Sequence, residues 1–150
     1  MNNSVKKTDY IIRPITYTDF ESHLILLSQL TDIGKYTKYK DYCEQSDRAK
    51  INNTHMFVMV MENKQVVCGT LLVESKIIHQ LGQVGHIEDI VVDKTKRGQG
   101  LGKIMIDFLT KEAKLRGCYK TILNCKQELV GFYQSCGYTE TQRQMSNYFK

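Results

Sequence analysis

The sequence has no apolar run that approaches the roughly 20 residues of a membrane-spanning helix, which argues against membrane insertion. Its first ten residues, MNNSVKKTDY, lack the apolar core of a signal peptide, so we expect a cytoplasmic location. The chain also lacks internal repeats, low-complexity tracts and a composition typical of linkers. We therefore expect residues 1–150 to form one domain, with residues 1–9 flexible.

Cysteine is present, but its spacing excludes two common uses. None of the five cysteines forms a C-x-x-C pair, and an odd number leaves one over. We predict reduced, mostly buried thiols and neither a zinc site nor a disulfide framework. The net charge of +5 comes from dispersed basic residues, so it suits an anionic ligand and is only a weak sign of nucleic-acid binding.

The most informative stretch is residues 85–102, GHIEDIVVDKTKRGQGLG. Its β-branched residues around the acidic pair Glu88-Asp89 predict a strand. A charged turn at residues 93–97 leads into a loop with three glycines. Beyond the loop, apolar residues recur at helical spacing and predict an α-helix: Leu101, Ile104, Met105, Phe108 and Leu109.

A glycine loop between a strand and a helix suits pyrophosphate. The first N–H groups of a helix lack intrahelical partners, the helix dipole favours anions, and glycines allow close approach. The Walker motif does not fit, because Lys103 is followed by Ile104 and not by Ser or Thr. The Rossmann motif does not fit either, because the spacing here is G-x-G-x-G.

The remaining elements predict a mixed chain. Strands are expected at residues 10–15, 56–61, 66–73, 119–125 and 144–149, with a hairpin turn at residues 62–65. A capping box at Thr18 and Glu21 predicts one helix, and the spacing of Tyr36, Tyr39 and Tyr42 favours a second. A short helix is expected at residues 127–135. The order is βααβββαβαβ.

Arg97, Gly100 and Gly102 resemble the acyl-CoA loop, [QR]-x-x-G-x-[GA], of the GNAT acetyltransferase superfamily. The resemblance implies an α/β (α+β mixed) fold, with a mostly antiparallel central sheet flanked by helices. Four further segments narrow it: LSQLTDIG (residues 27–34), ESKIIH (74–79), GCYK (117–120) and FYQSCGY (132–138). Together with GHIEDIVV (85–92), they resemble the glucosamine 6-phosphate N-acetyltransferase family over residues 13–149.

That resemblance implies transfer of an acetyl group from acetyl-CoA to the 2-amino group of glucosamine 6-phosphate, on the route to UDP-N-acetylglucosamine. It implies no metal, and a homodimer that exchanges C-terminal strands and completes the sugar-phosphate site from both chains. For acetyl-CoA it points to Ile90, Val91, Val92, Arg97, Gly98, Gln99, Gly100, Leu101, Gly102, Lys103, Tyr133 and Ser135. For the sugar phosphate it points to Thr31, Lys76, His79, Glu88, Asp89, Tyr119, Lys120 and Tyr148.

Glu88 and Asp89 also stand out on the residues alone. Strand alternation places adjacent side chains on opposite faces, so one carboxylate would enter the packed side without a partner. A strand rich in Ile and Val accepts that cost more readily at a ligand site.

For the chemistry, the resemblance points to Tyr133 as the acid that protonates the CoA thiolate, and an N–H near Val91 is the natural oxyanion donor. Two departures from the family leave questions open. Many members have Asp where this chain has Asn124, which cannot be a base, so Glu88, Asp89, water or a backbone carbonyl must serve there. Some relatives have Arg for the phosphate where this chain has Tyr148.

Three alternatives remain. One is a GNAT enzyme for another small amine, such as a polyamine or aminoglycoside acetyltransferase. A polyamine enzyme would favour an acidic acceptor groove, whereas Lys76, His79 and Lys120 favour an anionic acceptor. A non-catalytic CoA-binding module could dispense with Tyr133 and the acidic pair, but this chain keeps both. A nucleic-acid-binding domain would need clustered basic residues interleaved with aromatics, and the sequence shows no such cluster.

Overall fold

A five-stranded sheet organises the fold, and its strands lie side by side in sequence order, β1-β2-β3-β4-β5. The computed structural model describes residues 9–34 and 37–149. Neighbouring strands from β1 to β4 are antiparallel, and β4 and β5 are parallel. The strands are β1 (Ile11–Pro14), β2 (Thr54–Met61), β3 (Lys64–Ser75), β4 (Gln83–Val92) and β5 (Cys118–Ile122).

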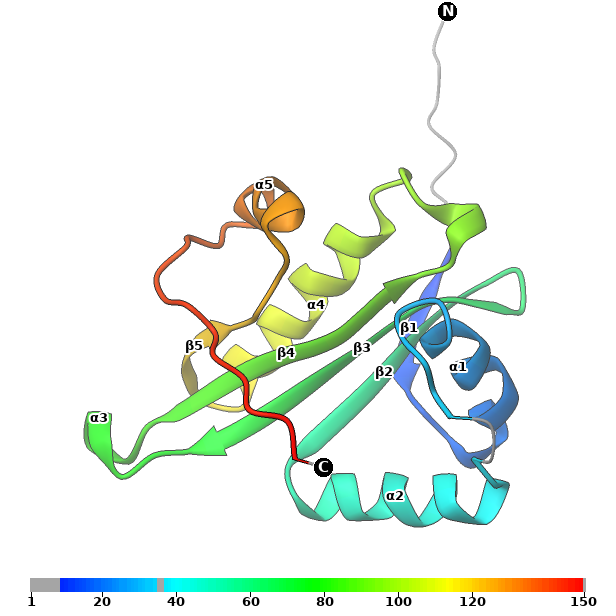
Figure 1. The fold of residues 1–150 in the computed structure, drawn as a ribbon, viewed down its shortest axis with the longest axis horizontal. Helices are drawn as coiled ribbons and strands as arrows, with labels where there is room; N and C mark the ends of the chain where they lie inside the picture. The colour runs from blue at the N-terminus through cyan, green and yellow to red at the C-terminus, as the bar shows by residue number, and fades with distance from the viewer. Residues whose placement is uncertain (1–8, 35–36, 150) are drawn as a thin grey trace, which may run out of the picture.

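Helices cover both faces of the sheet (Figure 1). α1 (Phe20–Leu27) and α2 (Tyr39–Ile51) cover one face, and α4 (Leu101–Leu115) covers the other. Two short helices, α3 (Ile78–Leu81) and α5 (Val130–Ser135), lie at the β3–β4 turn and after β5. Single 3₁₀ turns precede three helices: η1 (Tyr17–Asp19), η2 (Lys94–Lys96) and η3 (Gln127–Leu129). The predicted mixed fold with a mostly antiparallel sheet is confirmed.

Apolar side chains fill both interfaces between helices and sheet. On the α4 side, Met105, Ile106 and Leu109 are fully buried against Met59 and Leu71. On the α1–α2 side, a second cluster comprises Ile15, Leu26, Tyr42, Val58, Cys68 and Val91. Each fully buried side chain of this size contributes about 1.5–3 kcal/mol. The apolar stripe of α4, packed against the sheet, therefore holds the glycine loop in place.

β4 carries a bulge where it pairs with β3. Thr70 pairs with Glu88 and Cys68 pairs with Val91, so Asp89 and Ile90 both lie opposite Gly69. Asp89 has a φ of 52°, a left-handed conformation that a non-glycine residue adopts at a cost. A Cβ on Gly69 would lie 2.7 Å from Ile90 Cδ1 and 2.9 Å from Leu109 Cδ1. Glycine at this position therefore allows Ile90 and α4 to close over the bulge.

We expect Gly69→Ala to lower the free energy of unfolding by about 1–3 kcal/mol, because the added methyl group overpacks the core. Urea denaturation measures the change. Gly131→Ala is the matched control, since a Cβ on Gly131 in α5 meets nothing within 4 Å and alanine favours a helix. A Gly69→Ala protein as stable as the wild type would show that the core at the bulge is not tightly packed.

Three local predictions are wrong. The capping box joins Thr16 and Asp19, not Thr18 and Glu21: the Thr16 N–H donates to Asp19 Oδ2 at 2.7 Å. The fifth strand ends at Ile122 and not at residue 125. No strand forms at residues 144–149, which are exposed and extend without a neighbouring strand (Figure 1). Tyr36 and residues 1–8 of the predicted flexible terminus lie outside the described residues.

Candidate active site

The glycine loop presents the start of α4 to open space. Gly98 and Gly100 have φ values of 76° and 78°, and a Cβ on either would meet nothing within 4 Å. Gly100 is the N-cap of α4 and supplies no side chain to satisfy the first N–H groups of the helix. These N–H groups, with the positive end of the helix dipole, suit a bound phosphate or pyrophosphate.

The turn between β4 and the loop is built around Asp93. The Thr95 N–H donates to Asp93 Oδ1 at 2.8 Å, and the Thr95 hydroxyl donates to the same oxygen at 2.5 Å. These bonds lower the pKa of Asp93 to about 2, so the carboxylate is ionised at any physiological pH. Arg97 Nε donates to the Val92 carbonyl at 3.1 Å, which folds the arginine side chain back on the end of β4. The turn thus sets the direction of the loop.

One edge of β4 is open beside the loop. β5 pairs with β4 only from Gln83 to His86, so the edge at residues 87–92 has no strand partner within the part of the chain that the structure describes. An open edge of this kind can pair with an extended, amide-bearing ligand. The three residues predicted to bind the cosubstrate there differ in orientation, because Ile90 and Val92 pack toward α4 and Val91 is buried on the other face.

α5, which carries Tyr133, lies beside the start of α4. Lys103 Nζ donates to the Ser135 carbonyl at 3.0 Å, which joins the first turn of α4 to α5. Tyr133 is partly buried against the main core, and burial raises the pKa of its hydroxyl above the ordinary value of 10.0, with a smaller contribution from the Cys125 thiol. Tyr133 therefore remains protonated near neutral pH, as an acid must.

The two tyrosines of this region differ in their hydroxyl groups. The Tyr138 hydroxyl is bonded to Thr121 Oγ1 at 2.8 Å and to Thr110 Oγ1 at 3.0 Å. No side-chain hydrogen bond among residues 9–34 and 37–149 engages the hydroxyl of Tyr133. The Tyr133 hydroxyl is therefore available to a ligand, whereas that of Tyr138 is used to join α4, β5 and the end of α5.

The acidic pair does not alternate as predicted, because the bulge intervenes. Asp89 is exposed and Glu88 is partly buried, so neither carboxylate is sealed in the core. Burial, followed by the charge of Asp89, raises the pKa of Glu88. Neither residue has an ion-pair partner within the described ranges. The charge of Glu88 makes a small contribution to the raised pKa of Tyr133.

The residues predicted to bind the sugar phosphate fall into two groups. Glu88, Asp89 and Thr31 belong to the half of the molecule near η2. The other group lies at α3 and β5, at the opposite end of β4 (Figure 1): Lys76, His79, Tyr119 and Lys120. Tyr148 is 90% exposed on the C-terminal segment. One chain alone does not bring the whole predicted set together.

The group at α3 has its own internal contacts. The His79 and Tyr119 rings lie 4.7 Å apart, and Lys120 Nζ lies 5.7 Å from the centre of the Tyr119 ring. His79 has a φ of 54° in a left-handed turn. Lys76 forms an ion pair with Glu74, and His86 Nε2 lies 2.8 Å from the same carboxyl group. The sequence analysis assigned no role to Glu74. Its contact with His86 depends on the pairing of β3 with β4, which the sequence does not show directly.

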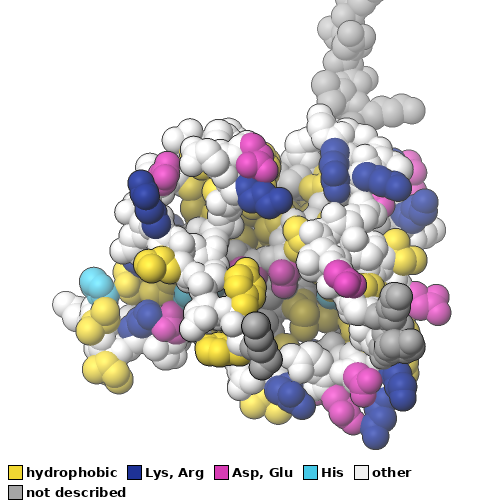
Figure 2. All heavy atoms as spheres, in the orientation of Figure 1, with side chains coloured by type: hydrophobic (Ala, Val, Ile, Leu, Met, Phe, Trp, Pro, Cys, Tyr) yellow, Lys and Arg dark blue, Asp and Glu magenta, His cyan; other side chains and the backbone are white. Residues whose placement is uncertain are grey.

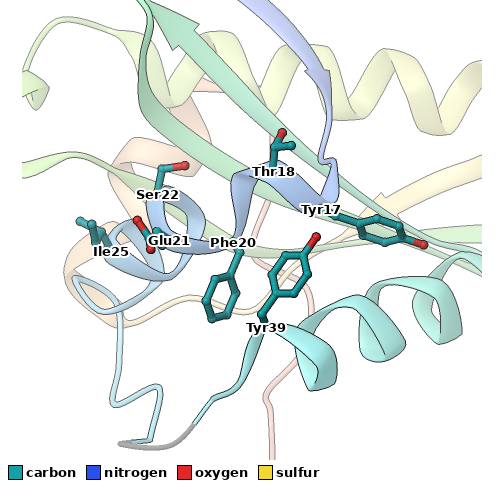
Figure 3. Close-up of a pocket in the computed structure, with 7 residues that line it drawn as sticks. All are labelled: Tyr17, Thr18, Phe20, Glu21, Ser22, Ile25 and Tyr39. Carbon is teal, nitrogen blue, oxygen red and sulfur yellow. The ribbon is translucent and has the colours of Figure 1, made fainter.

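The surface is hollowed between the part formed by α5 and the C-terminal segment and the part formed by α1 (Figure 2). A separate depression of about 580 Å³ lies between η1, α1 and the start of α2, and seven residues line it: Tyr17, Thr18, Phe20, Glu21, Ser22, Ile25 and Tyr39 (Figure 3). It contains none of the predicted site residues and is widely open to solvent. We therefore place the candidate site at the open edge of β4, beside the loop and α5, the helix that carries Tyr133.

Residues 9–34 and 37–149 contain neither a helix that could cross a membrane nor a cluster of metal-ligating side chains. None of the helices there combines the length and apolar character needed to cross a bilayer. No group of three or more His, Cys, Asp or Glu side chains in those ranges is arranged to hold a metal ion.

Known proteins resemble this chain in sequence and in fold. The model of the family described as "Acetyltransferase (GNAT) family" matches residues 23–138. Glucosamine 6-phosphate N-acetyltransferase 1 of rice is 39% identical over 145 residues, covering 93% of this chain and 87% of the rice protein. The Candida albicans enzyme with the same activity in its name is 40% identical over 135 residues, covering 87% and 90%. The crystal structure of glucosamine-6-phosphate N-acetyltransferase from Arabidopsis thaliana superposes with a TM-score of 0.87 at 35% identity, covering 95% of this chain and 99% of that one.

Proposed function

This chain belongs to the acetyltransferase (GNAT) family, and we propose that it transfers the acetyl group of acetyl-CoA to the 2-amino group of glucosamine 6-phosphate. The products are N-acetylglucosamine 6-phosphate and CoA. The observation that carries this proposal is the identity of 35–40% to enzymes of that name over at least 87% of the chain. The open loop at the start of α4 supports acetyl-CoA as the cosubstrate.

The proposed reaction is direct attack of the neutral amine on the thioester carbonyl. A C–N bond forms, the C–S bond breaks, and the departing thiolate takes a proton from Tyr133. The proton lost by the amine passes to solvent or to Glu88, whose raised pKa makes it a better base than an ordinary glutamate. The N–H groups along the open edge near Val91 stabilise the tetrahedral oxyanion, and the same edge pairs with the pantetheine amides.

We propose further that the active form is a homodimer in which the partner completes the sugar-phosphate site. Two observations support this. The predicted phosphate residues at α3 and β5 lie toward the start of β4, whereas the acyl-CoA loop follows its end, so one chain does not bring the whole predicted set together. The C-terminal segment leaves Met145, Tyr148 and Phe149 at least 90% exposed, which a monomer seldom tolerates. Sedimentation analysis tests the dimer, and a monomer with full activity would contradict it.

A thiol-release assay tests the acceptor. Acetyl-CoA is incubated with the enzyme and with glucosamine 6-phosphate, unphosphorylated glucosamine or spermidine. We expect strong turnover with the phosphorylated sugar alone. Turnover only with spermidine would preserve the acetyltransferase and overturn the acceptor. Acetyl-CoA binding without turnover of any of the three would favour a different acceptor or a binding module.

Asn124 provides a separate test of proton removal. It follows β5, is exposed, and precedes Cys125, whose thiol influences the pKa of Tyr133. If only the Asn124 backbone carbonyl contacts the amine, Asn124→Asp changes kcat by no more than about threefold, because the backbone is unchanged. Steady-state kinetics measures this. A gain of about tenfold or more would show that the side chain takes part and that this chain works without its best base.

A further inference from the structure

Gln29 lies just beyond α1 and uses both ends of its side-chain amide to bind the turn before the acyl-CoA loop. Its Nε2 donates to Asp93 Oδ2 at 3.2 Å, and the Lys94 N–H donates to Gln29 Oε1 at 2.8 Å. These partners are 64 and 65 positions away in sequence. Gln29 is partly buried, and its bond to Asp93 is partly shielded from water, whereas its bond to Lys94 is exposed.

The two ends of this contact lead to different parts of the candidate site. On one side, Gln29 is two residues from Thr31, which belongs to the predicted acceptor residues. On the other side, Asp93 starts the turn that continues into Arg97 and the loop. The Asp93 N–H also donates to the Val66 carbonyl at 2.8 Å, so the turn is fixed to β3 and to the end of α1 together.

The chemistry at this position requires an amide. One end of the side chain must accept from a backbone N–H, and the other must donate to a carboxylate that stays ionised. A glutamate would accept from Lys94 but would place a second negative charge against Asp93. The other charged group acting on Asp93 is Lys64, at the start of β3. A methionine fills a similar volume and makes neither hydrogen bond.

We propose that Gln29 is a positioning residue that fixes the turn at Asp93–Lys96, and hence the acyl-CoA loop, to the acceptor segment at Thr31. It acts through Asp93 and Lys94 and touches neither substrate. This inference rests on the proposed function, because it assigns CoA to the loop that Gln29 supports. It predicts that CoA affinity depends on the hydrogen-bonding capacity of residue 29.

The test measures CoA binding by calorimetry for the wild type, Gln29→Met and Gln29→Glu, at pH 7.5 and pH 5.5. We expect Gln29→Met to raise the Kd for CoA about tenfold at both pH values, since two hydrogen bonds are lost. Gln29→Glu should bind more weakly still at pH 7.5. At pH 5.5 it should recover toward the wild type, because a protonated carboxyl group can donate to Asp93 and accept from Lys94.

Each Kd is divided by that of the wild type at the same pH, which removes the titration of the CoA phosphates. Gln45→Glu, an exposed change on α2, is the control for an added charge and should bind CoA as the wild type does at both pH values. Melting temperatures of the variants should stay within about 2–4 °C of the wild type, since about 1 kcal/mol is at stake in a chain of this size.

A Gln29→Met protein with wild-type CoA affinity would overturn the proposal. So would a Gln29→Glu protein whose relative affinity is the same at both pH values, since a role in packing alone does not respond to protonation of residue 29. The binding measurement needs no acceptor. A wild-type protein that binds CoA but does not acetylate glucosamine 6-phosphate would overturn the proposed acceptor and leave the result for Gln29 standing.

Discussion

Replacing Gly100 by Asp is expected to weaken CoA binding at least about 100-fold, with the fold retained. The added carboxylate would lie at the N-terminus of α4, where it competes with phosphate for the same N–H groups and repels it. The chain itself has room for the side chain, because a Cβ on Gly100 meets nothing within 4 Å. Asp also tolerates the left-handed backbone at this position better than most residues do. Calorimetry with CoA measures the loss.

Gly100→Asn is the matched control for this prediction. Asparagine has the shape of aspartate and the same tolerance of a left-handed backbone, but it carries no charge. We expect its CoA affinity to lie between those of the wild type and Gly100→Asp, so that the difference between the two variants measures the electrostatic part. A Gly100→Asp protein that binds CoA as tightly as the wild type would show that the pyrophosphate binds elsewhere.

The loop and its helix were predictable because their determinants are local. Glycines at 98 and 100 adopt the left-handed φ that glycine tolerates, and Leu101, Met105 and Leu109 repeat at the spacing that places them on one buried face. The Gly117 that ends α4 also has a positive φ, of 82°, as expected after a helix. Such features depend on residues that are close together in the sequence, so they can be predicted from the sequence alone.

The bulge at Asp89 could not be predicted, because its cause lies in another strand. Alternation along β4 alone places Glu88 and Asp89 on opposite faces. The absence of a side chain at Gly69, about 20 residues earlier, leaves room for Ile90 and α4 to pack over the extra residue. The bulge keeps Glu88 partly buried and Asp89 exposed, so the predicted alternation of the pair is wrong, and its role in binding stays a prediction.

The C-terminal segment shows a second limit. Residues 144–149 have an alternation that predicts a strand, but a strand needs a neighbour to pair with its backbone. No free edge of the sheet takes up this segment within the one chain. Predicting a strand from its pattern assumes that a partner strand exists, and the pattern itself does not say where that partner lies.

Replacing Tyr133 by Phe is expected to lower kcat by about 100-fold or more and to leave the KM for acetyl-CoA within about threefold. The thiolate that leaves CoA needs a proton in the transition state, so its donor affects turnover more than ground-state binding. The Tyr133 hydroxyl has no side-chain partner within the described ranges, so its removal should not lower the melting temperature. The residual rate comes from protonation by water.

Tyr138→Phe provides the opposite pattern and thus the control. Its hydroxyl joins Thr110 and Thr121, so its removal is expected to lower the free energy of unfolding by about 1–3 kcal/mol. Its kcat should remain within about threefold of the wild type. Steady-state kinetics and urea denaturation on both variants separate the two roles. A Tyr133→Phe protein whose free energy of unfolding falls along with its kcat would mean that this ring only packs in the core. The proton for the thiolate would then have to come from another group.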